Sequence, residues 1–198
     1  MCKFKQIYLR SKPVVLSITN DRIASPYQTC NNWNCPNLRY IPDILSCYGK
    51  YAKYLQDDYA GEYGFLNMFA SYPNFWVITD MSDEFMGFVF LDNFIGNGST
   101  NFSAELTVCF DKKAWGSYSA YCAKIFLKQC FDRFGFYKIK VLVFPDNYRT
   151  KTLMKKAGFE YETTLPCETL RNGQLQDIEV YSIKRKYYYK DEVNYVKH

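Results

Sequence analysis

The sequence predicts a single α/β (α+β) domain in which helices flank a mixed, mostly antiparallel sheet. Between residues 105 and 159 the chain alternates a buried strand, a long amphipathic helix, a second buried strand and a short helix. On both sides of this stretch, apolar segments are joined by short polar turns, which is typical of antiparallel hairpins. A chain of 198 residues with 48% hydrophobic residues is long enough to bury one core.

The first 74 residues predict one strand and one helix of this domain. The run PVVLSI at 13–18 has the composition of a strand, and a polar loop follows it. From residue 42 to about residue 60, apolar residues recur at helical spacing, and Pro42 suits a first helical turn. The apolar positions are Ile44, Leu45, Tyr48, Ala52 and Leu55.

Three antiparallel strands are predicted next. The apolar segments 75–80 and 85–94 flank the polar sequence MSDE, so they predict a hairpin. Asn97 and Gly98 then indicate another turn before a strand at 101–110.

The C-terminal part predicts two helices and a second hairpin. The helix after Gly116 has a buried stripe of Ala123, Phe126, Leu127, Cys130 and Phe134. A short Lys-rich helix is expected from 148 to 157, and Asn172-Gly173 joins strands at about 160–170 and 176–184 by a two-residue turn. Residues 186–198 form a basic, Tyr-rich tail that either docks on the domain or a partner, or frays.

Two positions in the β-α-β-α stretch have the chemistry of a ligand site. Gly116 lies between a strand and a helix, where bare backbone N–H groups and a helix N-terminus favour a phosphate or another anion. Asn147 follows the next strand, and strand ends of open α/β sheets commonly hold ligands. One ligand could use both positions.

The same stretch resembles the GNAT acyl-CoA-dependent N-acetyltransferases. The resemblance rests on the order strand, K-K-A-W-G-S-Y, long helix, strand, N-Y-R-T, short helix and A-G-F, and it runs from about Phe75 to Arg185. The segment R-N-G-Q-L-Q-D-I-E-V-Y-S-I is similar to the closing hairpin of the RimJ/RimL-like branch, whose members acetylate protein N-terminal amines or small amines. The resemblance therefore implies a GNAT core at 75–185 that uses acetyl-CoA as co-substrate.

The resemblance also implies roles for individual residues. Glu105 becomes the candidate general base, and Thr150 could donate to the departing thiolate or simply cap its helix. Asn147 would fix the pantetheine arm, and Arg149 and Lys151 either contact a cofactor phosphate or solvate the helix. The backbone of Val108, Cys109 and Phe110 would pair with pantetheine, and the loop of Lys113, Ala114, Trp115, Gly116, Ser117 and Tyr118 would hold the pyrophosphate.

Two residues depart from the family pattern and keep other functions open. Tyr118 occupies a position that is small in the family, and Met154 stands where many relatives carry a Tyr general acid. One alternative is a GNAT-shaped module that binds acyl-CoA without turnover. Another is a GNAT toxin that acetylates the amino acid on a charged tRNA, for which the formal charge of +5 is permissive.

The acceptor side is less defined by the sequence. In this family the helices after the first strand wall the acceptor side, so Tyr51, Tyr54, Asp57 and Asp58 could meet an amine. A solvated helix face explains the two carboxylates equally well. The sequence does not specify the acceptor or the oligomeric state.

The composition of the chain disfavours several other kinds of catalytic and metal site. The only His is His198, which disfavours Ser-His-Asp chemistry and His-dependent zinc sites. Cys30, Cys35 and Cys47 have an unusual spacing for a thiolate metal site, and buried or incidental thiols are the preferred interpretation, with no metal expected. The absence of an apolar leader or membrane segment, together with eight Cys, predicts a cytoplasmic protein with free thiols.

Overall fold

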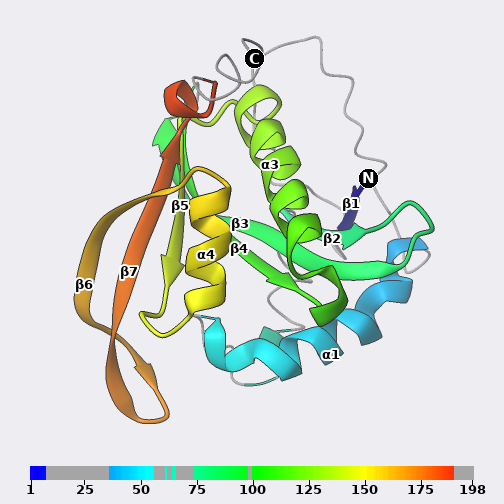
Figure 1. Ribbon diagram of the computed structural model, residues 1–198, viewed down its shortest axis with the longest axis horizontal. Helices are drawn as coiled ribbons and strands as arrows, with labels where there is room; N and C mark the ends of the chain where they lie inside the picture. The colour runs from blue at the N-terminus through cyan, green and yellow to red at the C-terminus, as the bar shows by residue number, and fades with distance from the viewer. Residues whose placement is uncertain (8–35, 56–60, 62–63, 66–73, 98–99, 190–198) are drawn as a thin grey trace. The chain divides into compact units, whose positions relative to one another are not determined.

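The computed structural model describes residues 1–7, 36–55, 61, 64–65, 74–97 and 100–189 (Figure 1). Seven strands form one mixed sheet in the order β1-β2-β3-β4-β5-β7-β6. Of the strand pairings described, only β4 with β5 is parallel. The predicted α/β class, with a mostly antiparallel sheet and flanking helices, is therefore confirmed.

The chain packs as two compact units, the first of which contains residues 1–52, 57–91 and 108–115. In it, β1 (Lys3–Ile7) pairs with β2 (Phe75–Thr79), and β2 pairs with β3 (Phe85–Asn97). The turns η1 (Pro36–Tyr40) and η2 (Ala52–Tyr54) flank helix α1 (Ile41–Tyr51). Stacked rings of Phe75, Phe88 and Phe90 fill its core.

The second unit contains residues 53–56, 92–107 and 116–198. The start of β4 (Thr100–Phe110) pairs with β5 (Lys138–Val143), and helix α3 (Ser117–Asp132) connects the two strands. Helix α4 (Tyr148–Lys156) follows β5 and leads into the hairpin of β6 (Glu160–Arg171) and β7 (Gln174–Lys184). β7 pairs with β5, so β6 is an edge strand.

Several local predictions are confirmed by the backbone. Asn172 and Gly173 both have positive φ, 55° and 75°, as a two-residue hairpin turn with right-handed strand twist requires. Phe126, Leu127 and Cys130 of the α3 stripe are buried. At the start of the tail, the Tyr188 ring packs on Phe131 of α3, with ring centroids 5.3 Å apart.

Other local predictions differ from the structure. The predicted helix at 42–60 ends at Tyr51 and continues only as the 3-10 turn η2, and residues 56–60 lie outside the described part. Strand β1 was not predicted, because Lys3–Ile7 has too few apolar residues for a clear strand pattern. The strand predicted at 13–18 lies outside the described residues. No helix in the described ranges is long and apolar enough to cross a membrane.

Candidate active site

Strand β4 is paired with β5 over only part of its length. The parallel register joins Ser103–Glu105 to Lys138–Lys140 and stops there, although β5 continues along β7 to Val143. Leu106 and Thr107 of β4 follow immediately and have no β5 partner in this register. Backbone groups at such a point are free to pair with an extended ligand.

The segment after β4 is a tight, capped turn in the first unit. The Asp111 carboxylate accepts a hydrogen bond from the Lys113 backbone N–H at 3.2 Å and caps η3 (Lys112–Ala114). The Trp115 indole N–H donates to the Phe110 carbonyl at 3.2 Å, so it folds the loop back on the strand end. The Lys113 ammonium forms an ion pair with Glu84 on the surface.

Gly116 begins helix α3 in a conformation that other residues rarely adopt. Its φ of 101° and ψ of −132° place it at the N-cap position, and a Cβ built there would meet no heavy atom within 4 Å. Gly116 and Ser117 are exposed, and Tyr118 is half-buried. The first N–H groups of this 16-residue helix therefore begin at an open, side-chain-free position, which suits an anion.

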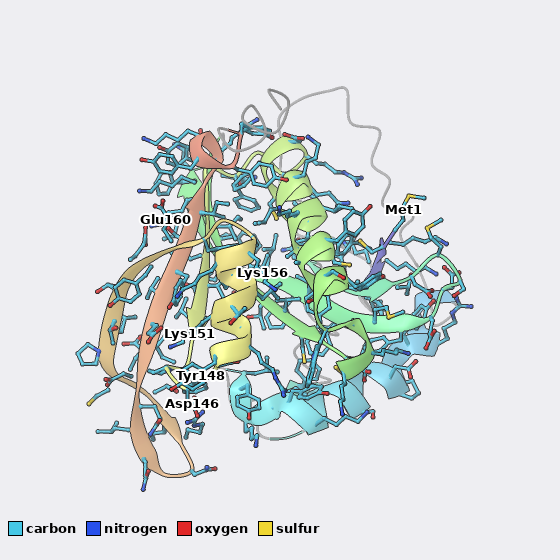
Figure 2. All side chains as sticks on the ribbon, in the orientation of Figure 1. Met1, Asp146, Tyr148, Lys151, Lys156 and Glu160 are labelled. Carbon is cyan, nitrogen blue, oxygen red and sulfur yellow. The ribbon has the colours of Figure 1, made fainter. Side chains whose placement is uncertain are left out.

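Asn147 is the N-cap of helix α4. Its side-chain Oδ1 accepts a hydrogen bond from the Thr150 backbone N–H at 3.2 Å, so the capping group is Asn147 rather than Thr150. Figure 2 shows Tyr148 and Lys151 at this end of α4 and Lys156 at the other. Arg149 is exposed beside them.

Lys151 is more enclosed than the sequence predicts. Its ammonium donates to the Pro145 carbonyl at 2.6 Å and forms an ion pair with Glu179 of β7 at 3.3 Å. The other oxygen of Glu179 accepts a hydrogen bond from the Tyr181 hydroxyl at 2.8 Å. Burial, together with this hydrogen bond, raises the pKa of Tyr181 to about 12, so the phenol stays protonated.

Glu105, the predicted general base, has two partners in the second unit. One carboxylate oxygen pairs with the Lys140 ammonium at 2.8 Å, and the other accepts from the Asn93 amide at 2.7 Å. The side chain is 17% exposed. The carboxylate is therefore fixed in orientation but remains reachable from solvent.

The sequence reasoning missed two side-chain pairings. Glu179 and Tyr181 lie on one face of β7, but the run IEVYSI does not reveal which residues face α4. Cys47 of α1 and Cys109 of β4 lie with their sulfurs 3.6 Å apart, and this hydrogen bond and burial raise the pKa of the Cys109 thiol. Cys30, Cys35, Asp57 and Asp58 lie outside the described residues.

Comparison with protein families identifies the class of enzyme. The acetyltransferase (GNAT) domain matches residues 32–160, which is more than half of the chain. The chain therefore belongs to the GNAT acetyltransferase family. Members of this family are N-acetyltransferases that use acetyl-CoA, so the predicted enzyme class and co-substrate are confirmed. A comparison with curated proteins gives no match.

Solved structures share the fold at low sequence identity. A spermidine N-acetyltransferase from Vibrio cholerae, in complex with CoA and spermine, is 21% identical and has a TM-score of 0.63; the alignment covers 77% of this chain and 92% of that one. A GNAT-family acetyltransferase from Bacillus anthracis is 16% identical and has a TM-score of 0.64, with coverage of 75% and 91%. At these identities the likeness supports the fold alone.

Proposed function

We propose that this enzyme transfers the acetyl group of acetyl-CoA to a primary amine, on a protein N-terminus or a small molecule, as in the RimJ/RimL-like branch. The observation that carries the proposal is Gly116. It places an exposed, side-chain-free backbone at the N-terminus of α3, directly after the β4 strand and its capped turn. This geometry suits the pyrophosphate of CoA.

In this proposal the donor is bound mainly by backbone. The strand end Val108–Phe110 pairs with the pantetheine amides, and the loop from Lys113 to Tyr118 receives the pyrophosphate. The Nδ2 amide group of Asn147 faces the pantetheine arm, while its Oδ1 caps α4. Arg149, exposed on the first turn of α4, supplies positive charge for a phosphate.

Acetyl transfer then requires movement of one proton. The neutral amine attacks the thioester carbonyl, the C–S bond breaks as the C–N bond forms, and CoA leaves as a thiolate. Glu105, directly or through water, accepts the proton that the amine loses, and Thr150 donates a hydrogen bond to the departing sulfur. The products are the acetylated amine and CoA.

The test has two stages. Mass spectrometry of the purified protein, followed by calorimetry with acetyl-CoA, asks whether the donor binds. CoA release is then measured with N-terminal peptides, di- and polyamines, and aminoacyl-tRNA as acceptors. CoA release with a peptide or a small amine supports the proposal. CoA release only with aminoacyl-tRNA assigns the toxin activity. Acetyl-CoA binding without CoA release with any acceptor assigns a binding module instead of an enzyme.

A further inference from the structure

Arg171 makes a two-pronged ion pair at the end of β6. Its Nη1 and Nη2 reach Oδ1 and Oδ2 of Asp146 at 3.1 and 2.9 Å. Paired, parallel N–H···O bonds of this kind are the strongest and most directional that a carboxylate makes. The same pairing lowers the pKa of Asp146 below its usual value, because the hydrogen bonds from Arg171 favour the ionised carboxylate.

The guanidinium is also packed against the strand end that precedes Asp146. It lies 4.4 Å from the ring centroid of Phe144, which is 2% exposed, and Nη1 approaches the Lys53 carbonyl at 3.4 Å. The planar group is therefore held on its face as well as at its edge. A Lys at this position could keep the positive charge but could not donate two parallel hydrogen bonds to one carboxylate.

This contact matters because no third strand within the described ranges pairs with the outer half of the β6–β7 hairpin. β5 pairs with β7 only from Glu179 to Lys184, so Gln174–Ile178 pairs with β6 alone, and Figure 1 shows the hairpin continuing past the end of β5. An isolated two-stranded ribbon is marginally stable in water. The Arg171–Asp146 pair connects this ribbon to the β5–α4 connection.

The β5–α4 connection is held from a second direction by Lys151. The ammonium binds the Pro145 carbonyl and the Glu179 carboxylate, as described above. Pro145 and Asp146 are thus each bound by a cation, and the next residue in the chain is Asn147. Figure 2 labels Asp146 and Lys151 near this end of α4. Strand β6 supplies Arg171 for the contact with Asp146, and β7 supplies Glu179, which pairs with Lys151.

We propose that Arg171 is a positioning residue for acetyl-CoA binding, acting through Asp146 on Asn147. Without the two Arg171–Asp146 hydrogen bonds, the β5–α4 connection that carries Asn147 is less ordered. Acetyl-CoA must then order this connection when it binds, which weakens its affinity. In the same arrangement Lys151 is a second positioning residue rather than a direct phosphate ligand. The inference rests on the proposed function, because it assigns Asn147 to the donor site.

The decisive experiment is a double-mutant cycle on acetyl-CoA affinity. Arg171→Met should raise the Kd for acetyl-CoA by about tenfold, the size of coupling found between contacting residues. Arg171→Lys should raise the Kd nearly as much, because Lys keeps the positive charge but cannot make the two parallel hydrogen bonds to Asp146. In an Asn147→Ala background, Arg171→Met should have almost no further effect on Kd.

The control removes a Lys–Glu ion pair elsewhere in the unit. Lys138 and Glu162 lie 2.7 Å apart, and Glu162 is on the same strand as Arg171. Glu162→Gln should leave the Kd for acetyl-CoA unchanged, and its melting temperature provides the comparison for general destabilisation. A Glu162→Gln variant that weakens acetyl-CoA as much as Arg171→Met would overturn the inference.

The other outcomes separate this inference from the proposed function. Additive effects of Arg171→Met and Asn147→Ala on Kd would show that Arg171 does not act through Asn147. An Asn147→Ala variant with normal Kd would also overturn the inference, while the wild-type enzyme would still release CoA with its acceptor. Failure of the wild type to bind acetyl-CoA would contradict both this inference and the proposed function.

Discussion

The Glu105 carboxylate is held by Lys140 and Asn93, and this arrangement has consequences for catalysis. Both oxygens already accept a hydrogen bond, from partners at 2.8 and 2.7 Å. An amine proton, whether it arrives directly or through water, must therefore reach an oxygen that already accepts one of these hydrogen bonds. The pairing fixes the direction of the carboxylate, which favours a relay of defined geometry over a mobile surface base.

We expect Glu105→Gln to lower turnover by roughly 10²- to 10⁴-fold with little change in acetyl-CoA affinity, because the amide keeps the shape but not the basicity. The loss should shrink as pH rises, since more of the amine substrate is then already neutral. The measurement is the rate of CoA release as a function of pH.

Glu162→Gln is the matched control for this experiment as well. Its carboxylate also pairs with a β5 lysine, at 2.7 Å, so the substitution removes the same type of group. Equal activities of the Glu105→Gln and Glu162→Gln variants at every pH would move the general base to another residue, and Asp57 and Asp58 would be tested next.

At the scale of secondary structure, the start of α3 is the most sensitive element. Gly116→Asp should abolish acetyl-CoA binding, because a carboxylate would occupy the position proposed for the pyrophosphate. The protein should remain folded, because a Cβ at this position has open space around it and the backbone strain at its positive φ costs only about 1–3 kcal/mol. Calorimetry with acetyl-CoA and circular dichroism measure the two properties.

Gly116→Ala separates charge from backbone strain. The φ of 101° disfavours any side chain, so this variant should be destabilised by about 1–3 kcal/mol. It should nevertheless bind acetyl-CoA far better than Gly116→Asp. Equal affinities of the two variants would mean that strain, rather than a phosphate site, explains the effect.

Periodicity and turn chemistry were sufficient to predict most elements of the fold. The α3 stripe, the Asn172-Gly173 turn and the strands around Gly116 follow from spacing within a few residues. Strand β1 was missed because edge strands with alternating charge carry a weak apolar signal. The end of α1 was also missed, since Gly49 lies inside the helix rather than after it, and no Gly or Pro follows Tyr51 before Gly61.

The hydrogen bonds and ion pairs between side chains of the site could not be predicted in the same way. Lys151 and Arg171 bind partners 28 and 25 positions away, Glu179 and Asp146. Such pairs depend on strand register, which a single sequence does not fix. Residue types at Gly116 and Asn147 pointed to a ligand site and the family resemblance pointed to Glu105, whereas the contacts around these residues required the structure.

At the scale of the whole molecule, acetyl-CoA should stabilise the native state. A ligand present at about 100 times its Kd adds roughly 2.7 kcal/mol to the free energy of unfolding. The melting temperature should therefore rise clearly with millimolar acetyl-CoA. Pantetheine, which lacks the pyrophosphate and the phosphorylated adenosine of CoA, is the control and should give a much smaller shift. An unchanged melting temperature with acetyl-CoA would contradict the proposed function.

Acid should destabilise both units of the molecule. Hydrogen bonds from Lys5 and Lys3 lower the pKa of Asp83 from 3.8 to about 2, and Arg171 lowers that of Asp146. Because these folded-state values lie below the unfolded ones, the stabilisation is present above about pH 4. It is lost as the pH falls through the folded-state pKa values.

The measurement for this prediction is urea unfolding between pH 2 and pH 6. The free energy of unfolding should fall with decreasing pH below about pH 4. Asp83→Asn should make this decline shallower, because one of the carboxylates is then absent. The same slope in the variant and the wild type would assign the acid sensitivity to other groups.

The pairing of β1 with β2 determines the order in which the sheet can form during translation. The Lys3 ammonium binds the Met81 carbonyl, 78 positions further along the chain, and Lys3 itself pairs with Thr79. At a ribosomal rate of 5–20 residues per second, β1 waits on the order of ten seconds for its partner strand to be made. Throughout that interval its lysines discourage pairing with other nascent chains.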